Sequence, residues 1–491
     1  MKVFLINPPF KVEYGKFSRD QRSPAITKSG TVYYPTWLAS ATGVLEEAGY
    51  ECRLLDSCVK QMNDETTLAI IKDFAPDMIV IDTSTPSIYN DCKFAEKVKE
   101  VLPECFTVLV GTHPSALPEE TMELNTSVDA VARKEYEYTL RELAHYVKIG
   151  NMDFRQILGL TYRTADGKII SNPDRPYIED LDALPFVSKV YKEHGVDPKD
   201  YFFAAAEYPM MIIFTGRGCP NSCFFCVYPQ VFHGRKLYRT RSSQNVVEEI
   251  KYILTNFPEI KSIGFEDDTF TADIERTRII CKMLIEQGLN KKFNWWVNAR
   301  VDLDLETMQL MKEAGCRLLI AGFESGNQAI LNKMHKGIKL EWSKQYVKNA
   351  KKAGLIIHGC FMVGNPGDTK ETMEETFQLS LKLNPDTAQF FPLMVYPGTE
   401  AYKWAQIRGY LTTNDFSKWV TEDGLHSCII STPEISAEEL VAFCDEARRR
   451  YYLRPAYIFS KLRQFIFYPA ERKRLLKAGV RFIKFISKKG K

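Results

Sequence analysis

Three of the twelve cysteines lie within eight residues, at Cys219, Cys223 and Cys226, just after a predicted strand. Three thiolates at this spacing can bind one metal centre together. A tetrahedral zinc site needs a fourth cysteine or histidine, and His233 is the only candidate in the ten residues that follow. Three ligands without an obvious fourth fit an iron–sulfur cube with one iron left open, although the spacing differs from that of ferredoxins. A zinc site and structural thiols are the alternatives.

Polar residues and glycines follow several predicted strands in the second half of the chain. We expect them to gather at one edge, because the carboxyl ends of barrel strands form a common face where ligands bind. Arg300 can pair with a carboxylate, and Gly364 allows a ligand to approach the backbone closely. The alternatives are helix capping and solvated acids, and a surface ion pair for Arg300. The candidates are Glu266, Asp267, Asp268, Arg300, Glu324, Ser325 and Gly364.

Six short apolar segments alternate with segments of helical periodicity from residue 210 onward. This alternation predicts βα units and a parallel sheet. Eight such steps would predict a closed TIM barrel, whereas six predict an open, partial (β/α)6 barrel. The predicted strands are 211–214, 262–265, 293–297, 318–321, 356–362 and 388–391.

Residues 1–150 carry a strand–helix series of their own, which predicts a doubly wound, Rossmann-like α/β domain. The predicted strands are 3–6, 53–55, 78–81, 106–110 and 130–132. Ligands bind at the carboxyl ends of the strands in such sheets. There the chain places Asn7, Ser84, Thr85, Gly111 and His113.

Composition and charge exclude several classes of protein. Of the 491 residues, 45% are hydrophobic and 26% are charged, which rules out a wholly disordered or collagen-like chain. No apolar run reaches the roughly 18 residues of a transmembrane helix, and the first residues lack the features of a signal peptide. We therefore expect a cytoplasmic protein. A net charge of +3 lacks the basic excess typical of nucleic-acid binding, so we expect no nucleic-acid partner.

We divide the chain into an N-terminal domain at 1–150, a linker with a hairpin at 151–205, a partial barrel at 206–433 and a helical region at 434–491. Residues 471–491 contain nine Lys or Arg and one Glu. On a helix their apolar and basic side chains fall on different faces, which predicts peripheral contact with an anionic membrane surface. The alternatives are a helix packed on the barrel and an RNA-binding tail.

The cysteine motif resembles that of the radical S-adenosylmethionine (radical SAM) superfamily. The aromatic Phe225 directly precedes the third cysteine, and the motif follows the string Phe214-Thr-Gly-Arg-Gly. The resemblance implies that Cys219, Cys223 and Cys226 bind a catalytic 4Fe–4S cluster, with Phe225 beside it. It further implies that this cluster cleaves SAM to a 5′-deoxyadenosyl radical, which abstracts hydrogen from an unactivated carbon.

The same resemblance assigns roles to the strand-end residues of the barrel. It implies that the acidic group Glu266, Asp267 and Asp268 faces the SAM ammonium. It places Glu324 and Ser325 toward the ribose and methionine ends of SAM, and Gly364 toward the adenosine.

The N-terminal domain is similar to that of the cobalamin-binding class of radical SAM enzymes. The similarity rests on the opening Phe-Leu-Ile-Asn-Pro-Pro and on strings such as Gly111-Thr-His113-Pro and Arg133-Lys-Glu135-Tyr-Glu137, and with the barrel it covers about residues 1–435. It implies cobalamin at the strand ends that carry Asn7, Ser84, Thr85, Gly111 and His113. The Asp-x-His-x-x-Gly signature is absent, so we expect base-off cobalamin without a histidine ligand. A cofactor-free domain is the alternative.

These observations predict a radical enzyme that uses cobalamin for methyl transfer, or for rearrangement or cyclisation, at an unactivated carbon. Strings such as Tyr34-Pro-Thr-Trp and Lys336-Gly-Ile resemble, more loosely, the ring-contracting subgroup of hopanoid biosynthesis, which implies a small-molecule or lipid-like substrate. A low-potential electron donor such as flavodoxin or ferredoxin is implied as a partner. The alternatives are a radical SAM enzyme without cobalamin and a non-catalytic iron–sulfur sensor or scaffold.

Overall fold

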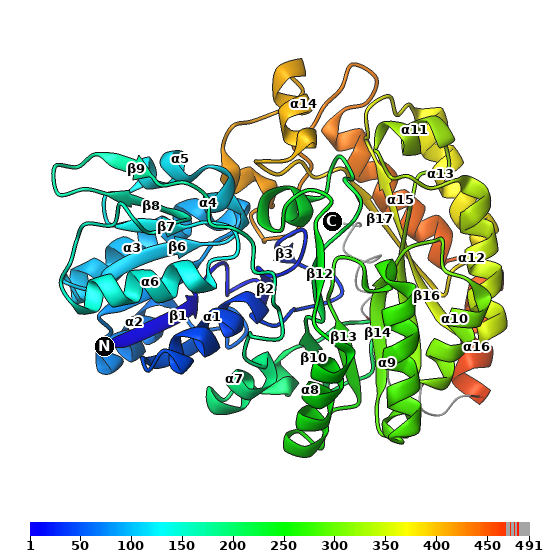
Figure 1. Cartoon of the computed structure of the whole chain (residues 1–491). Helices are drawn as coiled ribbons and strands as arrows, with labels where there is room; N and C mark the ends of the chain where they lie inside the picture. Colours follow the sequence, from blue (N-terminus) through cyan, green and yellow to red (C-terminus); the bar gives the residue numbers. More distant parts are fainter. Residues whose placement is uncertain (468–471, 473–475, 477–478, 481–491) are drawn as a thin grey trace.

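In the computed structural model, which describes residues 1–467, 472, 476, 479 and 480, a mixed sheet and a parallel sheet lie side by side with their helices. Figure 1 shows the first sheet in blue and cyan and the second in green and yellow. The fold is therefore α/β, a Rossmann-like domain followed by a partial barrel and a helical C-terminal region, as the sequence predicts.

The first sheet has seven strands in the order β4-β1-β5-β6-β7-β8-β9, of which β4 to β7 are parallel. The central strands are continuous apolar runs because helices cover both of their faces. The hairpin predicted in the linker is present, and its first strand pairs antiparallel with β7. The strands are β1 Lys2–Asn7, β4 Glu51–Asp56, β5 Met78–Asp82, β6 Phe106–Val110, β7 Ala130–Ala132, β8 Leu160–Arg163 and β9 Ile169–Ser171. The main helices are α1 Thr36–Glu47, α2 Asp64–Phe74, α3 Ile88–Val101 and α6 Glu137–Lys148.

The second sheet has six parallel strands in the order β10-β13-β14-β15-β16-β17 and does not close, so the barrel is partial. In its register Ile213, Phe265 and Val297 stand next to one another, which brings the carboxyl ends of β10, β13 and β14 to one edge. The strands are β10 Met210–Ile213, β13 Ser262–Phe265, β14 Asn294–Ala299, β15 Cys316–Glu324, β16 Ile356–Val363 and β17 Thr387–Pro392. The covering helices are α8 Ser243–Asn256, α9 Ile274–Glu286, α10 Leu305–Glu313, α12 Leu340–Ala353 and α13 Lys370–Leu383.

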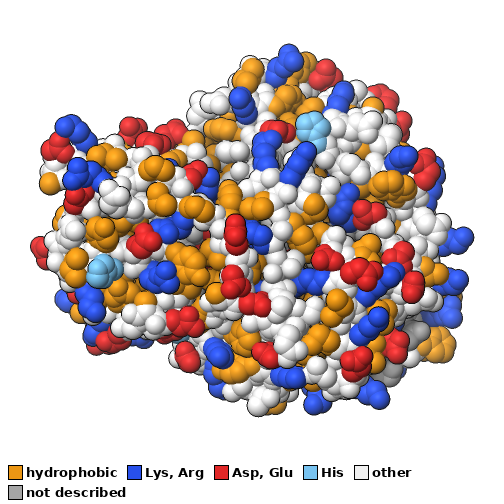
Figure 2. Space-filling view, in the orientation of Figure 1, with side chains coloured by type: hydrophobic (Ala, Val, Ile, Leu, Met, Phe, Trp, Pro, Cys, Tyr) orange, Lys and Arg blue, Asp and Glu red, His pale blue; other side chains and the backbone are white. Residues whose placement is uncertain are grey.

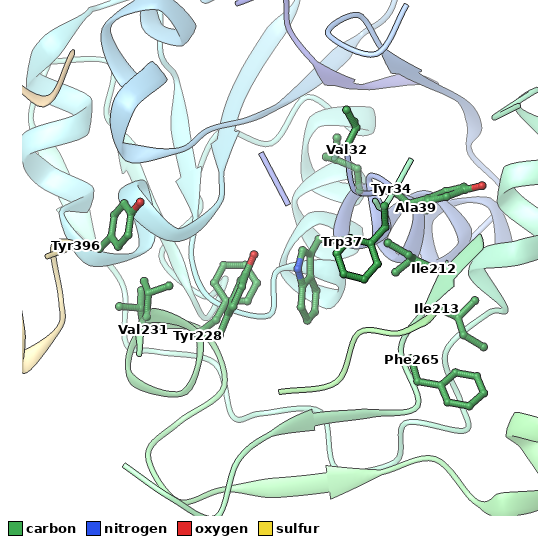
Figure 3. Packing of buried hydrophobic residues seen from close by; sticks show 14 of the residues in the cluster. Val32, Tyr34, Trp37, Ala39, Ile212, Ile213, Tyr228, Val231, Phe265 and Tyr396 are labelled. Carbon is green, nitrogen blue, oxygen red and sulfur yellow. The ribbon is translucent and has the colours of Figure 1, made fainter. Parts of the chain in front are cut away.

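One hydrophobic core runs through both domains, and Trp37 of α1 lies where they meet. Its indole packs against Phe214, which follows β10, with ring centroids 4.5 Å apart, and against Phe232 at 5.2 Å. Figure 3 shows Trp37 beside Tyr228 of the barrel, whose ring lies 6.2 Å away. Large aromatic contacts of this kind bury much apolar surface, so they fix the barrel against the first domain.

Two helices end the described chain. Helix α15, Ala437–Tyr452, packs on β17, where the Tyr452 hydroxyl bonds with the backbone of Ala388. Helix α16, Pro455–Phe467, has no buried residue. Among the described residues no helix combines the length and the apolarity needed to cross a membrane. Most of 471–491 lies outside the described residues.

Candidate active site between the two domains

The three motif cysteines lie on one loop at the mouth of the barrel. The loop follows the short hairpin strand β11 Gly216–Gly218, which pairs with β12 Tyr238–Thr240. The Gln230 amide donates to the carbonyls of Cys223 and Cys226 at 3.0 and 3.1 Å and thereby closes the loop. Cys219, Cys223 and Cys226 are half-buried residues, whereas Cys281 and Cys316 are buried.

Two observations bear on the zinc alternative. Within the described part of the chain, no three histidine, cysteine or acidic side chains converge closely enough to hold a single metal ion. Zinc needs all of its ligands at about 2.0–2.3 Å from one point, whereas a 4Fe–4S cluster spreads its cysteine ligands over separate iron atoms. His233, the candidate fourth zinc ligand, has its Nδ1 engaged by Glu135 at 3.0 Å.

The acidic residues after β13 divide into two kinds. Asp267 is fully buried and accepts from the backbone N–H and the hydroxyl of Thr215, both at 2.6 Å, so it joins β10 to β13. Glu266 and Asp268 line a small cavity between the two domains. Burial raises the pKa of Glu266. The cavity is also lined by Arg22, Trp37, Tyr228 and His233.

Arg22, from the segment that precedes α1, occupies this cavity together with the acids. Its guanidinium pairs with Glu266 and lies 3.4 Å from an oxygen of Asp268. Even so, Oε2 of Glu266 and Oδ2 of Asp268 are buried without a hydrogen-bond partner among the described residues. Buried polar atoms of folded proteins normally have partners, so these two oxygens mark a place for a cationic or hydrogen-bond-donating ligand.

A third carboxylate lies at the end of β15. Glu324 has a positive φ of 61°, a strained conformation that often marks a functional site. Its Oε1 accepts from Lys336 at 2.7 Å, and its Oε2 has no partner among the described residues. The charges of Lys336, Glu324 and Arg300 all act on the Cys223 thiol, which places these groups beside the loop.

Two predicted barrel residues have packing roles in this structure. Ser325 is fully buried, and its hydroxyl lies 3.3 Å from that of Thr376. Gly364 has a φ of +87°, and a Cβ at this position would lie 2.9 Å from the side chain of Leu440 in α15. Its lack of a side chain therefore lets α15 approach the barrel.

The predicted residues of the first domain do meet at one edge of its sheet. Gly111 has a φ of +116°, and a Cβ there would lie 2.1 Å from the carbonyl oxygen of Thr83, so only glycine fits. The His113 Nδ1 lies 3.3 Å from the Thr85 hydroxyl, and burial lowers the pKa of His113 to about 3. Ser84 forms a capping box at the start of the following helical turn. Asn7 ends β1 with its buried Oδ1 unpaired within the described chain.

Sequence reasoning missed several charged residues at this edge and at the domain junction. Arg19 forms a fully buried ion pair with Asp91 at 2.7 Å, and burial raises the pKa of nearby Asp82 to about 7. Glu135 and Glu137 pair with Arg217, Arg239 and His233 of the barrel. Glu135 and Glu137 belong to a string on which the resemblance rests. For Arg217, its position as a charged residue between two glycines just before Cys219 was the sequence signal that could have drawn attention to it.

The site residues thus fit a cluster and SAM. Three cysteines share one loop, a small cavity lies beside Glu266 and Asp268, and Glu266, Asp268 and Glu324 each have a carboxylate oxygen without a hydrogen-bond partner among the described residues. The ammonium and sulfonium of SAM are cationic and suit this acidic surrounding. On the face of the molecule drawn in Figure 2, Lys, Arg, Asp and Glu side chains are interspersed, with no large area of a single charge.

Comparisons with known proteins agree with this geometry. The family model for the radical SAM superfamily matches residues 213–380, and that for the B12 binding domain matches residues 22–144. The chain is 31% identical over 463 residues to an uncharacterized methyltransferase of Pyrococcus horikoshii, covering 94% of this chain and 95% of the relative. It is 26% identical to the anaerobic magnesium-protoporphyrin IX monomethyl ester cyclase of Cereibacter sphaeroides, covering 86% and 67%. It is 24% identical to the hopanoid C-3 methylase of Methylococcus capsulatus, covering 89% and 78%.

Among solved structures, the fold is similar to that of the radical SAM methyltransferase TsrM from Kitasatospora setae with cobalamin and a 4Fe–4S cluster bound. The TM-score is 0.69 at 17% identity, covering 93% of this chain and 89% of TsrM. The matched B12 domain argues against the alternative without cobalamin. These relatives are named as a methyltransferase and a cyclase, which argues against a non-catalytic sensor or scaffold.

Proposed function

The chain belongs to the radical SAM superfamily and carries a B12-binding domain; from this premise we propose that it transfers a methyl group to an unactivated carbon of a small, lipid-like molecule. The observation that carries this proposal is the cavity between the domains. Gly216 and Tyr228, which flank the cysteine loop in sequence, line this cavity together with Trp37 of the first domain. Glu266 and Asp268 also line it, and each has a carboxylate oxygen without a hydrogen-bond partner among the described residues. A methyl donor on one domain and a radical source on the other require such an arrangement.

We assign the cluster to Cys219, Cys223 and Cys226, and the SAM ammonium to Glu266 and Asp268. When bound, the cluster and SAM supply a radical that abstracts hydrogen. The residues of the chain itself orient the bound groups and exclude water from them. Lys336 neutralises Glu324 beside the loop at 2.7 Å, and the Trp37 and Tyr228 rings form an apolar wall of the cavity. A dry wall of this kind protects a radical from side reactions.

We assign cobalamin to the edge of the first sheet. Gly111 is required at this edge, because a side chain there would collide with the carbonyl oxygen of Thr83. Because His113 is buried against Phe416 and its Nδ1 faces Thr85, we propose base-off binding without a histidine ligand. A cytoplasmic electron donor of low potential, such as flavodoxin or ferredoxin, would supply the electrons.

The experiment is anaerobic reconstitution with cobalamin, reductant and methyl-labelled SAM, incubated with lipid and sugar-lipid extracts and followed by mass spectrometry. Label in a product that the Cys223→Ala protein does not form supports methyl transfer. Unlabelled product with stoichiometric 5′-deoxyadenosine contradicts it and favours the second candidate, cyclisation or rearrangement. That candidate has its own support in the 26% identity to the cyclase.

We also propose that the protein visits an anionic membrane surface, which would give access to a lipid-like substrate. Helix α16 exposes a row of large apolar side chains, with 70% of Phe459, 55% of Leu462 and 60% of Ile466 accessible. Such a face next to the basic segment 471–491 suits the plane of an interface. The hopanoid named for one relative gives further support to a lipid-like substrate.

Sedimentation with liposomes tests this contact. We expect salt-sensitive binding to vesicles that contain anionic lipid, because each Lys or Arg near such a surface contributes about 1 kcal/mol. Deleting 471–491 should abolish it, and Phe459→Ser should weaken it at constant charge. Equal sedimentation of the full and shortened proteins would remove the membrane from the proposal.

A further inference from the structure

The cysteine loop is fastened to the B12-binding domain at both of its ends. Arg217 stands two residues before Cys219, and its guanidinium donates to Glu137 at 2.5 Å and to the Ser40 hydroxyl at 3.2 Å. His233 stands seven residues after Cys226, and its Nδ1 lies 3.0 Å from Glu135. The loop therefore lies between two attachments, and both acceptors belong to the first domain.

Glu135 is surrounded by donors. Arg239 donates to its two oxygens at 2.9 and 2.5 Å, and the backbone N–H of Ile178 donates to Oε2 at 3.0 Å. Burial alone would raise the pKa of Glu135, but the hydrogen bonds from Arg239 and His233 bring that pKa well below its usual range. A carboxylate only accepts hydrogen bonds, so both of its oxygens can accept from these donors. The amide of a glutamine would instead direct its own N–H groups at some of them.

These groups are withdrawn from water. The exposed fraction of the side chain is 2% for Glu135, 1% for Glu137 and 4% for Arg217. Removing one partner of a buried ion pair leaves the other charge buried without compensation. This lowers the stability of the fold far more than the loss of a surface pair does. The Arg217 guanidinium also lies 4.8 Å from the centre of the Trp37 ring. Charge and apolar packing thus meet at the same end of the loop.

The contacts of Glu135 continue through His233 to Asp268, which lines the cavity. Because Glu135 can only accept, the proton on Nδ1 of His233 points to it, and Nε2 faces the other way. Nε2 lies 4.0 Å from Oδ2 of Asp268, the oxygen that has no hydrogen-bond partner among the described residues. A shift of about 1 Å would bring these two atoms within hydrogen-bonding distance, and Nε2 donates to Oδ2 when the imidazole carries a proton on both of its nitrogens.

We infer that Glu135 and Glu137 are positioning residues that hold the cysteine loop at both ends and, through His233, align Asp268 for SAM. This inference rests on the proposed function, which places the cluster on the loop and the SAM ammonium at Asp268. It adds that docking of the B12-binding domain shapes the SAM site. Neither Glu135 nor Glu137 needs to touch a cofactor.

Hydrogen exchange on the full-length, cofactor-free protein tests the first half. In Glu135→Gln and Glu137→Gln, amides within 216–240 should exchange about tenfold faster or more, since a hydrogen bond to a charged group is typically worth at least that factor. The matched control is Glu46→Gln, which alters another glutamate of the same domain, paired with His194 at 2.9 Å. The control should leave 216–240 unchanged.

The EPR spectrum of the reduced, reconstituted cluster tests the second half. His233→Asn keeps a donor near the position of Nδ1 but removes Nε2. We expect its 216–240 exchange to stay near that of the wild type, while the SAM concentration that half-saturates the spectral change rises about tenfold, the loss expected for one charged hydrogen bond. A merely structural role for His233 would change the exchange rate and the iron content instead.

The outcomes separate the inference from the function on which it rests. If SAM leaves the wild-type spectrum unchanged, the proposed function fails. If the wild type responds to SAM but both glutamine variants exchange like the wild type in 216–240, the inference fails alone. A glutamine variant that exchanges faster everywhere, including β5 and β15, has lost its fold, and the decision then falls to His233→Asn. Wild-type SAM dependence in that protein overturns the inference.

Discussion

Replacing Gly218 by alanine should prevent cluster assembly without touching a cysteine. Gly218 ends β11 directly before Cys219 and has a φ of +84°. A Cβ at this position would lie 2.0 Å from the carbonyl oxygen of Leu237, at the start of the partner strand. The two strands would have to separate, and Cys219 would move with them.

The size of the effect follows from this geometry. Ordinary contact begins at 3.4 Å, so the strands must part by roughly 1.4 Å, which breaks close packing. Alanine in a left-handed conformation costs about 1–2 kcal/mol, and each lost backbone hydrogen bond adds about 1 kcal/mol. Together these give roughly 2–5 kcal/mol. Since about 1.4 kcal/mol is a factor of ten in an equilibrium, cluster occupancy should fall at least tenfold.

The assay is iron and sulfide content per chain after anaerobic reconstitution, with urea unfolding as a check on the fold. Gly288→Ala is the matched control, because Gly288 has a φ of +62° but nothing within 4 Å of its virtual Cβ. It should lose only the backbone cost of about 1–2 kcal/mol and keep its iron. Equal iron in both variants and the wild type would refute the steric argument.

Three further outcomes are expected. Cys223→Ala should lose the cluster absorption and all SAM cleavage, whereas Cys281→Ala, in the barrel core, should keep both; SAM cleavage by the first variant would contradict the ligand assignment. His113→Ala should leave the EPR spectrum of bound cobalamin unchanged and without histidine nitrogen coupling, because we propose base-off binding; a spectrum that changes would make His113 a ligand. Burial raises the pKa of Asp82 from 3.8 to about 7, so the folded state keeps a proton that the unfolded state releases, and the unfolding free energy should fall as pH rises across that interval. Asp82→Asn should flatten this part of the urea-unfolding profile, and a slope equal to that of the wild type would speak against it.

The strands and helices could be predicted because the pattern within a short stretch of sequence determines each of them. The run Met78–Ile81 is apolar throughout, as the interior of a strand buried on both faces must be. The cysteine spacing is equally local, and the three cysteines lie on one loop after β11. Alternation of such segments fixed the two sheets and the open barrel.

The partners of the charged residues could not be predicted, because no local pattern records them. Arg22 meets Glu266 across 244 positions of sequence, and Arg217 meets Glu137 across 80. The same limit explains the strand-end residues with packing contacts. Asp267 looks like its two acidic neighbours in the sequence, and only the position of Thr215 shows that it joins two strands.

The attachment of the loop has a consequence for biosynthesis. A chain leaves the ribosome from its N-terminus, and its first domain folds first. The last strand of the first sheet ends at Ser171, so Glu135 and Glu137 already stand on a finished sheet when Arg217, His233 and Arg239 emerge. The cations of the nascent barrel therefore meet a preformed acceptor. If a permuted gene encoded the barrel first, these cationic residues would emerge before Glu135 and Glu137 had been synthesised.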